Sequence, residues 1–181
     1  LSTTGVALTL SVAAGTILLS GLVGSLTTCR WGRCLQFVGD GASTRTITVS
    51  GWDYLGQPIT MTSTLNGSTP VKCTKAFMYI STVVFGAAAD TVSVSIGTTD
   101  VLGLPYQTAN MVSEMKSDVV AANAGTFTGA IYTDPQTATT GDPRGTYLPL
   151  TVIPNDVVPF SIIVNAAVTK GNLHGVAHYA V

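Results

Sequence analysis

Charged residues are scarce in this chain, and the first 29 residues contain none. Eight residues are Lys or Arg and nine are Asp or Glu among 181, so the net charge is −1 and 9% of the residues are charged. An ordinary soluble domain carries about 25%. Because no basic stripe is present to neutralise phosphates, the sequence excludes a nucleic-acid partner. A charge-poor, apolar chain is typical of a protein that works inside an assembly, since weak self-repulsion favours association.

Cysteine is also scarce, and its spacing matches neither a disulfide framework nor a zinc site. The three residues, Cys29, Cys34 and Cys73, are odd in number and irregularly spaced. Cys29 and Cys34 are separated by four residues, and no His lies near them to complete a metal site. We therefore expect reduced thiols, which agrees with synthesis in a reducing cytoplasm.

The only two histidines, His174 and His178, form no metal site on this reading. They lie in a segment, 173–181, whose pattern is that of a strand. Residues four apart in a strand are about 13 Å apart, which is too far for both to bind one ion. We expect these histidines to be structural or at the surface.

No residue set typical of catalysis occurs. Acidic residues are few, with Glu114 the single Glu, and four of the Asp residues lie in turn contexts, namely Asp40, Asp53, Asp90 and Asp142. No pair of carboxylates suggests a glycosidase. A Gly-x-Ser-x-Gly nucleophile elbow and a phosphate-binding loop are both absent from the sequence. We predict no catalytic, cofactor-binding or metal-binding residue, and we expect that the protein is not an enzyme.

Apolar residues dominate from residue 6 to residue 26, which leaves a membrane anchor or a signal peptide as an alternative. No basic residue precedes this segment, as a signal peptide requires, and aromatic or basic anchors flank it on one side only. Val6, Leu8, Leu10 and Val12 alternate with small or polar residues, and this period of two predicts a strand. We expect residues 1–39 to form an N-terminal arm or the first strands, and no membrane partner.

From residue 40 onward, alternating stretches separated by turn signals predict an all-β fold. We expect strands at 45–50, 59–65, 71–85 and 91–96, and Asn66-Gly67 is typical of a tight turn, in a type I′ hairpin or a similar loop. Residues 110–122 fit either a short helix or a bulged strand, and the three prolines of 133–149 predict a long loop. The remaining strands are expected at 126–128, 130–133, 157–168 and 173–181. The predicted architecture is a β-sandwich or jelly roll spanning residues 40–181.

A series of motifs in this part of the chain resembles small structural proteins of tailed-bacteriophage heads. Arg45-Thr-Ile-Thr-Val49 leads into Gly51-Trp-Asp-Tyr-Leu-Gly-Gln-Pro58, as an Arg-x-Ile-x-Val strand does in that family. The later motifs, in order, are Asn66-Gly67, Lys75-Ala-Phe77, Leu102-Gly-Leu-Pro105, the stretch from Ala138 to Tyr147, and Leu173-His-Gly-Val-Ala177. The chain departs from the pattern at Ile59-Thr-Met-Thr62, where acidic residues usually follow the proline.

The resemblance implies a capsid decoration, or cement, protein. Such a protein is made in the host cytoplasm, lies on the outer surface of the virion and has the major capsid protein as its partner. We expect a homo-oligomer that clamps neighbouring subunits, with a trimer favoured over a dimer, because multivalent seating turns modest affinities into stable binding.

Two alternatives to a decoration protein stay open. One is a carbohydrate-binding or adhesive β-sandwich on a virion or cell surface, with Trp52, Tyr54, Tyr132 and Tyr147 as the residues that stack on sugar rings. The other is an enzyme on a jelly-roll scaffold, because a fold does not exclude chemistry.

Overall fold

The computed structural model of the chain describes residues 8–12, 15–17, 32–87, 92–105, 108–117, 119–120, 125–131, 133–150 and 160–166. These residues form thirteen strands and no helix, which confirms the all-β prediction. The strands are β1 (Leu8–Val12), β2 (Gly15–Ile17), β3 (Arg33–Gly39), β4 (Thr46–Trp52), β5 (Pro58–Thr64), β6 (Val71–Phe77), β7 (Tyr79–Phe85), β8 (Val92–Gly103), β9 (Thr108–Lys116), β10 (Val119–Val120), β11 (Thr126–Thr128), β12 (Thr146–Leu148) and β13 (Phe160–Ala166).

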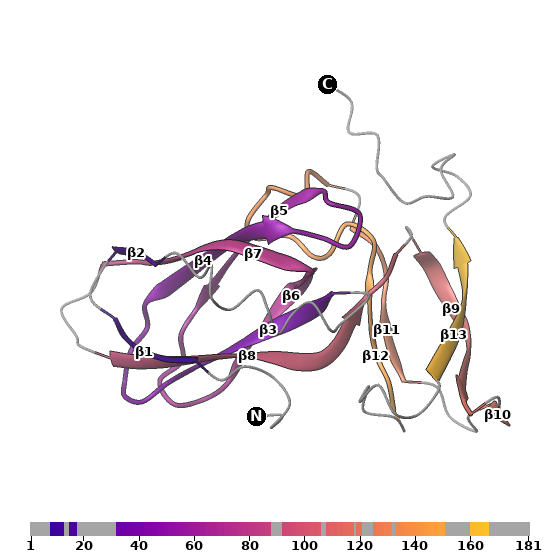
Figure 1. Cartoon of the computed structure of the whole chain (residues 1–181), viewed down its shortest axis with the longest axis horizontal. Coiled ribbons are helices and arrows are strands. Elements are labelled where there is room, and N and C mark those ends of the chain that lie inside the picture. The colour runs from indigo at the N-terminus through magenta and orange to yellow at the C-terminus, as the bar shows by residue number, and fades with distance from the viewer. Residues whose placement is uncertain are drawn as a thin grey trace.

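The strands belong to three antiparallel sheets (Figure 1). The first sheet has the order β11-β12-β8-β3-β6, and β1 pairs with the beginning of β8. The second sheet has the order β2-β7-β4-β5, and the third has the order β10-β9-β13. The third sheet lies at one end of the molecule, next to β11 and β12 (Figure 1).

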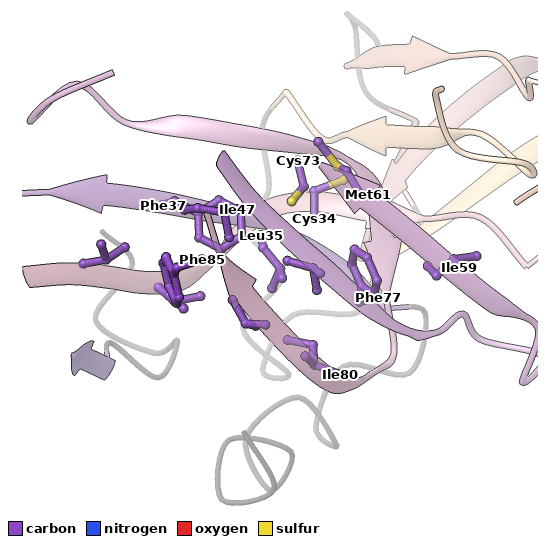
Figure 2. Packing of buried hydrophobic residues seen from close by; sticks show 14 of the residues in the cluster. Cys34, Leu35, Phe37, Ile47, Ile59, Met61, Cys73, Phe77, Ile80 and Phe85 are labelled. Atoms are coloured by element: carbon purple, nitrogen blue, oxygen red, sulfur yellow. The ribbon is translucent and has the colours of Figure 1, made fainter. Parts of the chain in front are cut away.

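The hydrophobic core lies between the first and second sheets. Phe37 of β3 is fully buried together with Ile47 of β4 and Phe85 of β7 (Figure 2). Burial alternates along β4, as the sequence predicts, because successive side chains of a strand point to opposite faces. The solvent-facing side of β4 carries hydroxyl side chains instead of charged ones. There Thr48 and Thr62 share a hydrogen bond between their Oγ1 atoms at 2.9 Å.

The N-terminal strands enter both facing sheets. β1 pairs with β8 and β2 pairs with β7, so the strand predicted around residues 8–12 is confirmed. The rest of the expected arm before residue 32 lies outside the described residues. In the part of the chain that the structure describes, no helix is long and apolar enough to cross a membrane.

The turn at Asn66-Gly67 is confirmed, but it does not close a hairpin. The amide of Thr69 donates to the carbonyl of Asn66 at 2.9 Å, and Gly67 has a φ of 56°, a conformation that favours glycine. The strands on either side, β5 and β6, belong to different sheets. The chain therefore uses this turn to pass from one layer of the sandwich to the other.

Several other expectations are corrected or completed by the structure. Residues 108–116 form the bulged strand β9, so the helical interpretation of 110–122 is wrong for this part. The strand predicted at 126–128 is confirmed as β11, whereas residues 130 and 131 belong to no strand. The expected loop 133–149 contains the short strand β12. β13 confirms the strand predicted within 157–168, and 173–181 lies outside the described residues.

Candidate functional site

The loop 133–145 covers the outer edges of β5 and β6, where the first and second sheets lie next to each other. The amides of Thr60 and Thr62 donate to the carbonyls of Pro135 and Ala138, at 3.2 and 2.7 Å. The Thr74 hydroxyl of β6 donates to the carbonyl of Thr140 at 3.1 Å. An uncovered edge strand exposes a row of unpaired backbone groups, and this loop satisfies them.

Lys75 fastens the loop from inside the protein. Its side chain is fully buried, and its Nζ donates to the carbonyls of Thr60, Pro135 and Thr137 at 2.8, 2.6 and 2.7 Å. An ammonium group has three hydrogens, so three carbonyl acceptors match it. Burial lowers the pKa of Lys75 to about 8, although the nearby carboxylate of Asp142 opposes this shift. Along β6, Lys75 is in phase with the buried residues Cys73 and Phe77, which is a signal in the sequence that it lies on the inner face.

Asp142 holds the end of the same loop. Its Oδ2 accepts from the amide of Ala76 at 2.9 Å, and its Oδ1 accepts from the amides of Arg144 and Gly145 at 2.9 and 3.0 Å. Burial raises the pKa of Asp142 to about 6, although these hydrogen bonds favour the charged form. The prediction that this Asp lies in a turn is confirmed.

Arg144 completes the buried cluster by pairing with a distant turn. Its Nη2 lies 2.7 Å from Oδ2 of Asp53, and both side chains are buried. The Oδ1 of Asp53 also accepts from the amides of Leu55 and Gln57, which confirms the turn predicted there. Burial raises the pKa of Asp53, and the guanidinium of Arg144 opposes this shift. Because these charges are closed off from solvent, their arrangement suits holding the loop in place.

A second buried polar contact fastens the third sheet to the sandwich. The Oε2 of Glu114, on β9, accepts from the hydroxyl of Tyr147, on β12, and from the amide of Gly125 at 3.1 Å. Both side chains are buried. Burial and the hydrogen bond to Glu114 raise the pKa of Tyr147 to about 12. Tyr147 is therefore no exposed stacking residue, and that expectation is wrong.

Two groups of exposed apolar side chains lie on neighbouring residues of the described strands and turns. One, the aromatic patch, consists of Trp52, Tyr54, Leu55 and Tyr79, which are between 38% and 42% exposed. The Trp52 and Tyr79 rings lie across the β4–β7 pair with centroids 5.1 Å apart. Two of the four expected stacking residues, Trp52 and Tyr54, are thus exposed. Tyr132 lies outside the described residues.

The other surface is on the third sheet, where Val120 and Ile163 are 61% and 50% exposed. Val119, which is 68% exposed, pairs with Lys116 and lies on the opposite face of the sheet. Residues opposite one another in an antiparallel pair share a face of the sheet. The register therefore defines the third-sheet face by Ser113, Met115, Val120, Ser161 and Ile163. This face contains no charged residue, and sequence patterning did not single it out.

Of the three cysteines and two histidines of the chain, the structure describes Cys34 and Cys73. Cys34 and Cys73 are free and buried, as expected, and burial raises the pKa of Cys73 to about 12. Cys29, His174 and His178 lie outside the described residues. Within the described ranges, no group of three or more His, Cys, Asp or Glu side chains could hold a metal ion.

Comparisons with known proteins identify no relative of the chain. No family model, no curated protein and no solved structure matches it. Its function is therefore inferred from its own motifs, charge and exposed surfaces.

Proposed function

We propose that the chain is a virion structural protein that decorates and stabilises a phage capsid as a homo-oligomer bridging neighbouring major capsid subunits. The observation that carries the proposal is the third-sheet face, where Val120 and Ile163 are half or more exposed and no charge is present. Exposed apolar surface of this kind marks sites of protein association. The motif resemblance supplies the class of partner, the major capsid protein.

The way this surface is held also supports a docking role. The buried contact between Glu114 and Tyr147 fixes the third sheet against β12, so its apolar side chains are presented from a braced element. A pre-organised surface loses less conformational freedom when it binds. Several such contacts in one oligomer add up, because multivalent binding exceeds the affinity of each contact by orders of magnitude.

Co-sedimentation tests this function directly. Purified protein is mixed with mature capsids that lack it, and we expect saturable binding at a fixed ratio to the major capsid protein. The variant Val120→Lys should bind at least tenfold more weakly, because it places a charge on the apolar third-sheet face. Thr64→Lys, an exposed change on β5, is the matched control and should bind normally. Failure of the wild-type protein to sediment with capsids would refute the proposal.

The aromatic patch favours a second function, binding of carbohydrate. Trp52 and Tyr54 are exposed as expected for residues that stack on sugar rings, and Tyr79 extends the surface beside Trp52. A glycan array probes this function with the wild-type protein and the Trp52→Ala variant. A hit that the variant loses supports carbohydrate binding, whereas an array without hits removes this alternative.

A further inference from the structure

The strand β13 forms an edge of the third sheet. It pairs with β9 along one side and, among the described residues, with no strand along the other. The outer edges of β5 and β6, in contrast, are hydrogen-bonded to the loop 133–145. Edge strands are usually protected by charged residues or proline. The seven residues of β13 include neither. As far as the described residues go, the second side of β13 is therefore able to pair with another strand.

β13 is also regular enough to act as a template. The register passes from Ile163 opposite Ser113 to Val164 opposite Met111, so the extra residue, Val112, belongs to β9. The second irregularity likewise leaves its extra residue in β9. A bulge interrupts the strand that contains the extra residue, so β13 itself remains continuous.

The sequence of β13, Phe-Ser-Ile-Ile-Val-Asn-Ala, is symmetric in polarity about its central residue, Ile163. If a copy of the strand lies antiparallel to it with Ile163 at the centre, Ile162 faces Val164 and Ser161 faces Asn165. The outermost pair is Phe160 with Ala166. The first pair joins two β-branched side chains, the second two polar side chains and the third two apolar side chains. Such self-complementarity is what an interface around a two-fold axis requires.

We propose that β13 pairs with β13 of a second copy of this chain around a two-fold axis centred on Ile163. The two third sheets then form one sheet in the order β10-β9-β13-β13-β9-β10. The partner is a second copy because the segment is complementary to itself and carries no charge that would oppose its own image. This inference rests on the homo-oligomer in the proposed function and makes that oligomer a two-fold assembly.

The size of the contact sets the strength that we expect. A stable complex usually buries about 800 Å² on each partner, and one pair of seven-residue strands covers less than that. We therefore expect a dimer with a dissociation constant in the micromolar range in solution. Binding of both copies to one capsid would strengthen it by multivalency.

Register-specific cross-linking tests the pairing. In a Cys29→Ser background, Ile163→Cys brings two thiols together at the axis, with Cα atoms about 4.5–5.5 Å apart, which suits a disulfide. Ser161→Cys is the matched control, because its two copies lie about 13 Å apart along the strands. With diamide as the oxidant, we expect a covalent dimer from the first variant and monomer from the second. Equal cross-linking of both variants, or of neither, would overturn the proposal.

A charge-exchange experiment provides a second readout. Ile163→Lys and Ile163→Glu each place like charges opposite one another and should weaken self-association at least 100-fold in sedimentation velocity. An equimolar mixture of the two should restore the dimer, because Lys then faces Glu. Thermal unfolding of each variant shows whether it is folded. If either variant is unfolded, the cross-linking of Ile163→Cys is the test of the pairing. A mixture that stays monomeric contradicts the pairing.

These experiments separate the pairing from the proposed function. A wild-type protein that binds capsids but remains monomeric at about 300 μM, or that forms trimers, would overturn the pairing alone. A protein that dimerises through β13 but never binds capsids would instead refute the capsid function and leave the pairing intact.

Discussion

Replacing Lys75 by Met removes the buried ammonium while keeping a side chain of similar length. Three carbonyls then lose a donor, and the one on Thr60 lies on the outer edge of β5. The carbonyls of Pro135 and Thr137 keep other donors, the amide of Thr60 and the hydroxyl of Thr140. We therefore expect the loop 133–145 to separate more easily from the edges of β5 and β6.

The expected loss follows from two opposing contributions. A hydrogen bond from a charged donor contributes about 1.5–3 kcal/mol, so three of them give roughly 5–9 kcal/mol. Burying an ammonium costs several kcal/mol, and Met does not incur this cost. The difference is a destabilisation of about 3 kcal/mol in the free energy of unfolding. It corresponds to about a 100-fold change in an equilibrium constant.

Urea unfolding measures the global loss, and hydrogen exchange locates it. The amides of Thr60 and Thr62 donate to the loop, so their protection should fall by about 100-fold in Lys75→Met. Lys72→Met is the matched control, because Lys72 is an exposed residue of the same strand. It should change stability by less than about 0.5 kcal/mol. Unchanged stability and unchanged protection in Lys75→Met would refute the role given to this ammonium.

Three further predictions concern buried positions. The folded pKa of Asp142, about 6, exceeds its ordinary value of 3.8, so stability should rise by up to about 3 kcal/mol as pH falls from 7 to 4. Urea titrations should show this increment disappearing in Asp142→Asn. Tyr147→Phe removes a donor to a buried carboxylate and should lower the unfolding free energy by about 2 kcal/mol, whereas an unchanged value would contradict that contact. Gly51→Ala places a Cβ 2.0 Å from the carbonyl oxygen of Tyr79 and should lower the melting temperature, whereas Gly41→Ala meets no atom within 4 Å and should leave it unchanged.

Local patterns predicted strands such as β4 and β5 well because these strands are buried on one side only. Ile47 and Val49 alternate with hydroxyl residues, and this alternation is readable without any knowledge of the partner strands. The pairing of strands was not predictable in the same way. Asn66-Gly67 identifies a turn, but the sheet that each flanking strand joins depends on contacts far along the chain.

The buried cluster of charges could not be predicted, because its members come together only in the folded chain. Lys75 is in phase with the buried Cys73 and Phe77 on β6, but its acceptors lie on β5 and in the loop 133–145. Asp53 and Asp142 each have a complete turn explanation of their own. What joins them is the path of the loop 133–145, whose prolines predict a loop but not its position. The same holds for Glu114 and Tyr147, which are 33 residues apart.

The scarcity of charge has a sharper consequence in the structure than composition alone suggests. Six charged residues, Arg45, Asp53, Lys75, Glu114, Asp142 and Arg144, are buried. Because the chain has only eight basic and nine acidic residues, at most eleven remain for its surface. The charges that would normally keep copies apart and protect edge strands are thus used inside, where they fix a loop and the third sheet. We expect a surface left with Thr, Ser and exposed Val and Ile to favour contact with other subunits. β13 has no charged residue that would repel a second copy, so it is where we propose this contact.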